Sequence, residues 1–358
     1  MFDIPVPLPI LEQTLDGIRT FGFDLNQLTP TGHRSFNITL PDGSVLNIKG
    51  LCASPVGIFG PKAQHQLNNS FLYISYEGDY FGKATMDDVR EEEGIYDDLE
   101  RKYPGLFLDP TTPIWALIGV INTGNKLEVW RPDDTDPREE VILVRRFPFT
   151  SWRIADAFVV DGKVYIDKEL ERLQKLWNVS DRQGVYIKAI GRLSSALSIL
   201  HSTGNVHGNL VWNLYDKNLD TIYIRPNNHN ISLDGSIGDF ELPIESYGKC
   251  DVNTMLRELL GSYSSYISLI ARIDPTLISD SIFINRLNQQ FKFSNQMFDE
   301  FLRSNNHLTE EYIQNYRNRV DLTLEGKKVQ SGIEYFDSIF FAQFGPAIID
   351  LTEKLIRR

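Results

Sequence analysis

The chain has 358 residues, 42% of them hydrophobic, and a formal net charge of -12 at pH 7. This length and composition allow one large buried core or two moderate lobes, so we expect a globular protein. The acidic balance and the scattered lysines and arginines exclude the electrostatic pattern of a nucleic-acid-binding protein. Cys52 and Cys250 show no spacing typical of a zinc site or a disulfide framework, which favours a reducing cytoplasm.

The N-terminal residues 1–24 lack the basic start and the apolar stretch of a signal peptide, and prolines interrupt them. No window approaches the roughly 18 uninterrupted apolar residues of a membrane helix. The most apolar stretch, PIWALIGVI at 113–121, has the length of a strand. We therefore expect no membrane partner.

Strand patterns dominate the first half of the chain. Residues 35–50, SFNITLPDGSVLNIKG, alternate in polarity on both sides of a Pro-Asp-Gly turn and predict a hairpin. Further strands are expected at 71–82, 114–131 and 139–147. One helix interrupts them, with Thr85 as a candidate N-cap and an end before the proline at 104.

Helical patterns dominate after about residue 167. The segment 168–177 and the segment 185–204 are amphipathic, and the second carries an apolar stripe that stops at a glycine. The region from Val252 onward is also expected to be helical. The sequence thus predicts an α+β fold with the two-lobed layout of a protein kinase.

We expect the domains of this fold to divide near residue 160. A sheet-rich N-lobe would span 1–160, including an N-terminal extension at 1–34. A helical C-lobe would span 161–358 and contain a short hairpin at 230–241.

Lys49 ends an alternating strand, where its ammonium could pair with ATP phosphates and with a carboxylate on the helix. The helix segment VREEEG offers Glu91, Glu92 and Glu93 as partners. A helical wheel places Glu92 and Glu93 nearer the apolar face, with Glu91 at its edge, and does not choose among them.

The segment 206–241 raises the main question of function. A kinase carries its catalytic Asp two residues after the His of this motif, and here that position is Asn209. Farther on, NISLDGSIGDFE predicts a tight hairpin with Asp-Gly at its turn, which brings Asn230 and Asp239 to the same end. Amide and carboxylate oxygens are magnesium ligands, although these residues could equally cap the hairpin and the element after it.

These residues resemble the motifs of the selenoprotein O pseudokinases, which transfer AMP from ATP to protein hydroxyls. The family signature is Val-His-Gly, then an Asn that starts a short hairpin, with a metal-binding Asp nine residues later. Here Val206-His207-Gly208 is followed by Asn230 and, nine residues on, Asp239. The resemblance covers roughly residues 40–260 and implies that Asn230 and Asp239 bind the metal.

The resemblance also implies roles for residues upstream. LNIKG resembles the family strand that carries the nucleotide lysine, which is Lys49 here, and VRE resembles the helix start that carries its partner, which is Glu91. Arg146 and Arg153 are seven apart in RFPFTSWR, like the two family arginines that grip the terminal phosphate. DPTTPIWAL at 109–117 is similar to the family's strand entry.

The chain departs from the family at several positions. An added hairpin is expected at 210–226, so that Asn213 becomes a second, less favoured candidate for the metal ligand. The family residue credited with base catalysis is an Asp, and here it is His229, whose imidazole could accept a hydroxyl proton near neutral pH. Lys83 stands where the family usually has Arg.

The leading hypothesis is a nucleotidyltransferase that uses ATP with Mg²⁺ or Mn²⁺ and places AMP on a hydroxyl of a protein or peptide. A ligase that forms an acyl-adenylate, or a small-molecule kinase, of the same fold is the first alternative. A catalytically inactive nucleotide-binding scaffold is the second.

Overall fold

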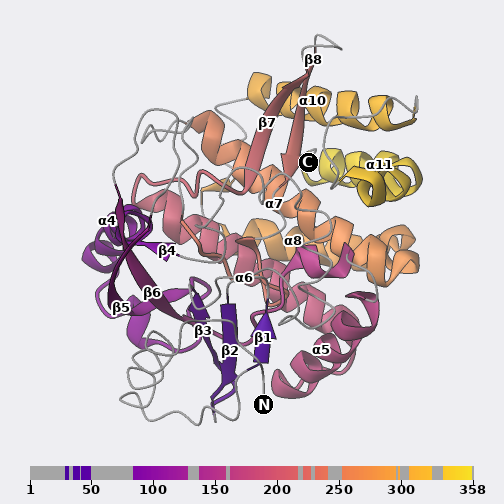
Figure 1. The fold of residues 1–358 in the computed structure, drawn as a ribbon. Helices are drawn as coiled ribbons and strands as arrows, with labels where there is room; N and C mark the ends of the chain where they lie inside the picture. Colours follow the sequence, from indigo (N-terminus) through magenta and orange to yellow (C-terminus); the bar gives the residue numbers. More distant parts are fainter. Residues whose placement is uncertain are drawn as a thin grey trace.

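The structure is a computed structural model that describes residues 29–31, 35–40, 42–49, 84–127, 137–158, 162–216, 221–226, 230–240, 252–295, 297–298, 306–324 and 334–356. It shows a mixed α+β fold, with an antiparallel sheet in the first half of the chain and mainly helices in the second (Figure 1). Four features named from the sequence lie outside the described residues: the strand at 71–82, Lys83, His229 and the two cysteines.

The sheet is built around β6. Its strands are β1 (Thr29–Thr31), β2 (Ser35–Thr39), β3 (Val45–Lys49), β4 (Ala84–Thr85), β5 (Ala116–Leu127) and β6 (Arg138–Phe147). Strands β1, β2, β3 and β6 follow one another in the sheet, and β5 also pairs with β6. Because β5 runs along one edge of β6, β3 and β4 share the other edge.

The expected hairpin of β2 and β3 is confirmed. The turn contains Gly43 with a φ of 84°, a left-handed conformation that glycine adopts without strain. The carboxylate of Asp42 accepts hydrogen bonds from the backbone N–H (2.9 Å) and the hydroxyl (2.6 Å) of Ser44. This turn sets the register that places Lys49 opposite Ser35 of β2. On its other edge β3 pairs with β6, where Lys49 lies opposite Leu143.

Helix α4 (Met86–Lys102) confirms the helix expected after Thr85. Its buried Val89 packs against Val141 and Leu143 of β6, and its buried Leu99 belongs to the large core. The helix therefore joins the sheet to the helical part of the molecule.

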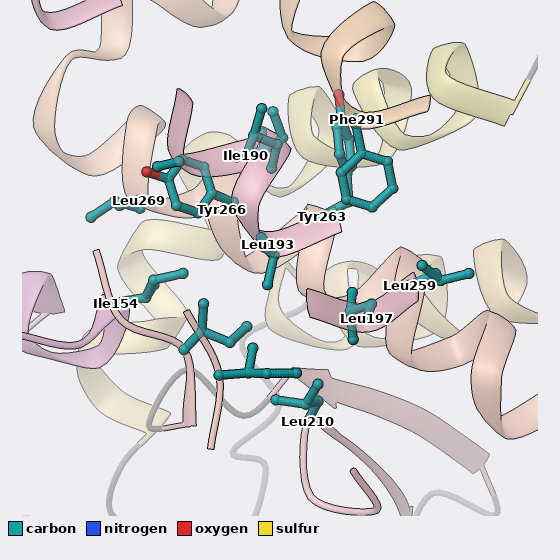
Figure 2. Close-up of a cluster of buried hydrophobic side chains, with 14 of the residues drawn as sticks. Ile154, Ile190, Leu193, Leu197, Leu210, Leu259, Tyr263, Tyr266, Leu269 and Phe291 are labelled. Carbon is teal, nitrogen blue, oxygen red and sulfur yellow. The ribbon is translucent and has the colours of Figure 1, made fainter. Parts of the chain in front are cut away.

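The second half of the described chain is largely helical, as the sequence predicts. Its elements are η4 (Ile154–Phe158), α5 (Gly162–Leu176), α6 (Arg182–Ser202), α7 (Val252–Ile273), η6 (Pro275–Ser279), α8 (Ser281–Ser294), α10 (Asn306–Leu324) and α11 (Glu334–Ile356). Figure 2 shows the core between α6, α7 and α8, where Leu193, Tyr263 and Phe291 are buried. None of the helices in the described part of the chain is long and apolar enough to cross a membrane.

The added hairpin also forms. Strands β7 (Val211–Asp216) and β8 (Thr221–Pro226) pair antiparallel, with Val211 opposite Pro226. They lie beside α7 and α10 (Figure 1). The hairpin separates the buried His207 from Asn230 along the chain.

Candidate functional site

The short hairpin between Asn230 and Asp239 forms as the sequence predicts. Ile231 and Ile237 make an antiparallel bridge, and the N–H of Gly235 donates to the carbonyl of Ser232 at 3.0 Å. The carboxylate of Asp234 accepts from the N–H (3.1 Å) and the hydroxyl (2.7 Å) of Ser236. This Asp-Gly turn, in which Gly235 has a φ of 79°, closes the hairpin.

Two segments that lead into and out of the sheet hold the hairpin on both sides. Before β5, the N–H of Trp115 donates to the carbonyl of Ile237 at 2.8 Å. After β6, the N–H of Ile154 donates to the carbonyl of Ile231 at 2.9 Å. Residues 230–240 are all buried, so the position of Asp239 is fixed relative to the sheet.

Three cationic side chains converge on the carboxylate of Asp239. The ammonium of Lys49 lies 2.7 Å from Oδ1, a guanidinium nitrogen of Arg145 lies 2.9 Å from Oδ1, and one of Arg153 lies 4.0 Å from Oδ2. These groups come from β3, β6, the segment after β6 and the hairpin. Asp239 has a φ of 68°, a left-handed conformation that is uncommon for a residue other than glycine.

Arg145 links this carboxylate to helix α4, because its guanidinium also pairs with Glu92. Both side chains are fully buried, and neither Nε of Arg145 nor Oε2 of Glu92 has a hydrogen-bond partner among the described residues. Buried polar atoms without a hydrogen bond cost free energy. These two atoms could therefore form a favourable hydrogen bond with a ligand that enters the cluster.

The remaining residues expected at the site are placed differently. Arg146, next along β6, donates instead to the carbonyl of Phe107 at 2.6 Å, because successive side chains of a strand point to opposite faces. The structure thus brings Lys49, Arg153 and Asp239 together and does not bring Arg146 to them.

Asn230 is buried at the start of the hairpin, on the opposite side from its Asp-Gly turn. Its amide nitrogen donates to the carbonyl of Asn209 at 3.3 Å, which directs Nδ2 toward the loop after His207. Glu91 lies on α4, but its side chain is outside the described part of the structure, as is all of His229.

His207 and Glu258 support the backbone next to Asp239. The ring Nε2 of His207 lies 2.9 Å from the carbonyl of Gly238, and the ring packs against Phe240 with centroids 5.0 Å apart. Burial lowers the pKa of His207, so the neutral ring donates from Nε2 to this carbonyl. The carboxylate of Glu258 on α7 accepts the backbone N–H groups of His207 at 3.0 Å and of Gly208 at 2.6 Å.

Sequence reasoning missed Arg145 and Glu258. Glu258 left a signal, since a lone acidic residue within the apolar pattern of α7 indicates a buried partner. Arg145 gave no such signal in the sequence. The residues just before it in β6 are apolar and buried on both faces, and its closeness to Lys49 depends on the pairing of β3 with β6, which are far apart in the chain.

The charge of the cluster favours an anion with several oxygens. Lys49, Arg145 and Arg153 carry three positive charges, and Asp239 and Glu92 carry two negative charges, so these five groups sum to +1. Guanidinium groups suit phosphate, which they bind through paired hydrogen bonds.

A metal would need ligands from outside the protein at this place. Among the described residues, no group of three or more His, Cys, Asp or Glu side chains could hold a metal ion. Magnesium, however, is commonly bound by one or two carboxylates together with substrate phosphates and water. Asp239, with the side-chain oxygen of Asn230, fits that arrangement when a polyphosphate supplies the other oxygens.

Comparison with known proteins gives no match: no protein-family model matches the chain, and no curated protein does either.

Proposed function

We propose that this protein has a kinase-like fold, binds ATP with Mg²⁺ or Mn²⁺ and transfers AMP to a hydroxyl of a protein or peptide. The observation that carries the proposal is the convergence of Lys49, Arg145 and Arg153 on Asp239. In kinases a lysine on the third strand contacts the phosphates, and an aspartate on an adjacent loop binds the metal that bridges them.

In this proposal the three cations bind the β- and γ-phosphates. Lys49 acts as a point charge, while the buried Arg145 uses for a phosphate oxygen its Nε, which has no hydrogen-bond partner among the described residues. Arg145 takes the role that the family resemblance gives to Arg146, and Arg153 keeps the role of the second arginine. When bound, a divalent cation supplies charge neutralisation on the polyphosphate.

The reaction needs an acceptor hydroxyl beside the α-phosphorus. Its oxygen bonds to that phosphorus, the bond from the phosphorus to the bridging oxygen breaks, and pyrophosphate leaves with the electron pair. We assign acceptance of the hydroxyl proton to His229, because the kinase aspartate is replaced by Asn209. An imidazole with a pKa near 6.5 accepts a proton near neutral pH.

One observation favours a second candidate, an inactive nucleotide-binding scaffold. Asp239 is already paired with Lys49 and Arg145, so the cluster can hold itself together without a metal. A scaffold would bind nucleotide and show no turnover, whereas ligases and kinases of the same fold would release other products.

Incubation with ATP labelled at the α- or the γ-phosphate, followed by intact mass of the protein and of candidate acceptors, tests the proposal. We expect the α-label and the mass of AMP on the acceptor, and loss of both in Asp239→Asn. Transfer of the γ-label indicates a kinase instead, and an adenylate trapped by hydroxylamine indicates a ligase. If the protein binds nucleotide but forms no product, and Asp239→Asn changes neither result, the protein is an inactive nucleotide-binding scaffold.

A further inference from the structure

Arg145 holds the carboxylate that a metal would need. Its guanidinium lies 2.9 Å from Oδ1 of Asp239, and Lys49 lies 2.7 Å from the same oxygen. Arg145 is fully buried and is anchored by Glu92, so it cannot swing into solvent. A divalent cation approaching Oδ1 meets two positive charges within hydrogen-bond distance of the atom it must bind.

The same arginine has capacity to bind a phosphate. Its Nε has no partner among the described residues although it is buried. A polyphosphate between Lys49, Arg145 and Arg153 would give each cation a new anionic partner. The Asp239 carboxylate would then be released from its two closest contacts and become available to a metal.

We propose that Arg145 and Lys49 together block the Asp239 carboxylate from divalent cations until a bound polyphosphate pairs with these two cations, so that the metal binds tightly only after the polyphosphate. This deepens the proposed function, on which it rests for the identity of the ligand. This block keeps the metal from binding tightly without the polyphosphate, and by linkage each ligand raises the affinity for the other.

Mn²⁺ titrations of the nucleotide-free protein, followed by electron paramagnetic resonance of free Mn²⁺, test this block. Arg145→Met is combined with Glu92→Gln, so that no buried carboxylate is left without its partner. Close charge pairs are coupled by at least about 1.5 kcal/mol, which corresponds to a factor of about ten in affinity. We therefore expect the double variant to bind Mn²⁺ at least about tenfold more tightly than the wild type.

Three further variants make the result specific. Adding Asp239→Asn to the double variant should abolish the gained site, because the metal ligand is then neutral. Lys49→Met, which keeps the pair of Arg145 and Glu92 intact, should also strengthen Mn²⁺ binding and serves if the double variant does not fold. Arg146→Met is the matched control, since Arg146 contacts the carbonyl of Phe107, and it should bind Mn²⁺ like the wild type.

The proposed block of Asp239 is wrong if the wild type binds Mn²⁺ through Asp239 as tightly as the variants do. It is also wrong if neither Lys49→Met nor the double variant binds Mn²⁺ more tightly than the wild type. Failure of the proposed function is a separate result. It would appear as no binding of ATP or inorganic tripolyphosphate to the wild type, and the titrations above contain neither compound.

Discussion

Replacement of Gly235 by alanine should destabilise the protein and displace the metal-binding hairpin. Gly235 has a φ of 79°, and a Cβ on it would lie 1.9 Å from the carbonyl oxygen of Ala189 and 2.9 Å from the backbone nitrogen of Leu193. Both atoms belong to the backbone of α6, which cannot move as a side chain can. The hairpin must therefore shift away from the helix.

The magnitude has two parts. A non-glycine residue in the left-handed region costs about 1–2 kcal/mol, and relief of an overpacked contact typically costs about 1–3 kcal/mol. Gly235→Ala should thus lose about 2–5 kcal/mol of unfolding free energy. Gly204→Ala is the matched control, because Gly204 has a φ of 84° and no atom of the described residues lies within 4 Å of its Cβ position, so only about 1–2 kcal/mol is expected.

Urea unfolding of the two variants measures the difference through the midpoint at a common slope. The hairpin also positions Asp239, so Gly235→Ala should weaken binding of an ATP analogue with Mg²⁺, while Gly204→Ala should not. If Gly235→Ala is no less stable than Gly204→Ala, the close packing of the hairpin on α6 is refuted.

Three other predictions concern the charged and titrating groups of the site. Glu92→Gln removes one of the two carboxylates beside the buried Arg145 and should cost up to about 3–5 kcal/mol, and adding Arg145→Met should recover part of this loss; strictly additive losses in a double-mutant cycle would contradict the pair. Without metal, Asp239→Asn should bind inorganic tripolyphosphate at least as tightly as the wild type, because a negative charge is removed. In calorimetry, Mn²⁺ should raise the tripolyphosphate affinity of the wild type but not of Asp239→Asn. If Mn²⁺ still raises the affinity of the variant, Asp239 is not a metal ligand. Burial lowers the pKa of His207 in the folded state, so the unfolded state takes up the proton first and this contribution to stability is lost as the pH falls below about 6.5. His207→Asn should reduce the slope of stability against pH in that window, measured by urea unfolding, and an unchanged slope would show that the ring is not held neutral.

Local turn chemistry made much of the fold predictable. The Pro-Asp-Gly and Asp-Gly turns, each next to alternating apolar residues, indicated the hairpin of β2 and β3 and the hairpin at 230–239, and both form. The periodicity of α4 placed both Glu92 and Glu93 near its apolar face; Glu92 is buried and Glu93 is exposed.

The partners of the charged residues could not be read in the same way. The family resemblance favoured Arg146, seven residues before Arg153, but the face of β6 that meets Asp239 depends on the register between strands. That register aligns Arg145 with Asn47 and puts Arg145 on the face that carries Lys49. Since residues 141–144 just before them are apolar and buried on both faces, no polarity contrast in the sequence distinguishes the two arginines.

The central claim is that a polyphosphate and a divalent cation meet at Asp239. A crystal structure with Mn²⁺ and a non-hydrolysable ATP analogue, with the metal located by its anomalous signal, tests this most directly. We expect a manganese peak in coordination contact with the Asp239 carboxylate, and phosphate oxygens in contact with Lys49 and Arg145. Nucleotide bound elsewhere, or Asp239 still paired with both cations beside a bound triphosphate, would contradict the claim.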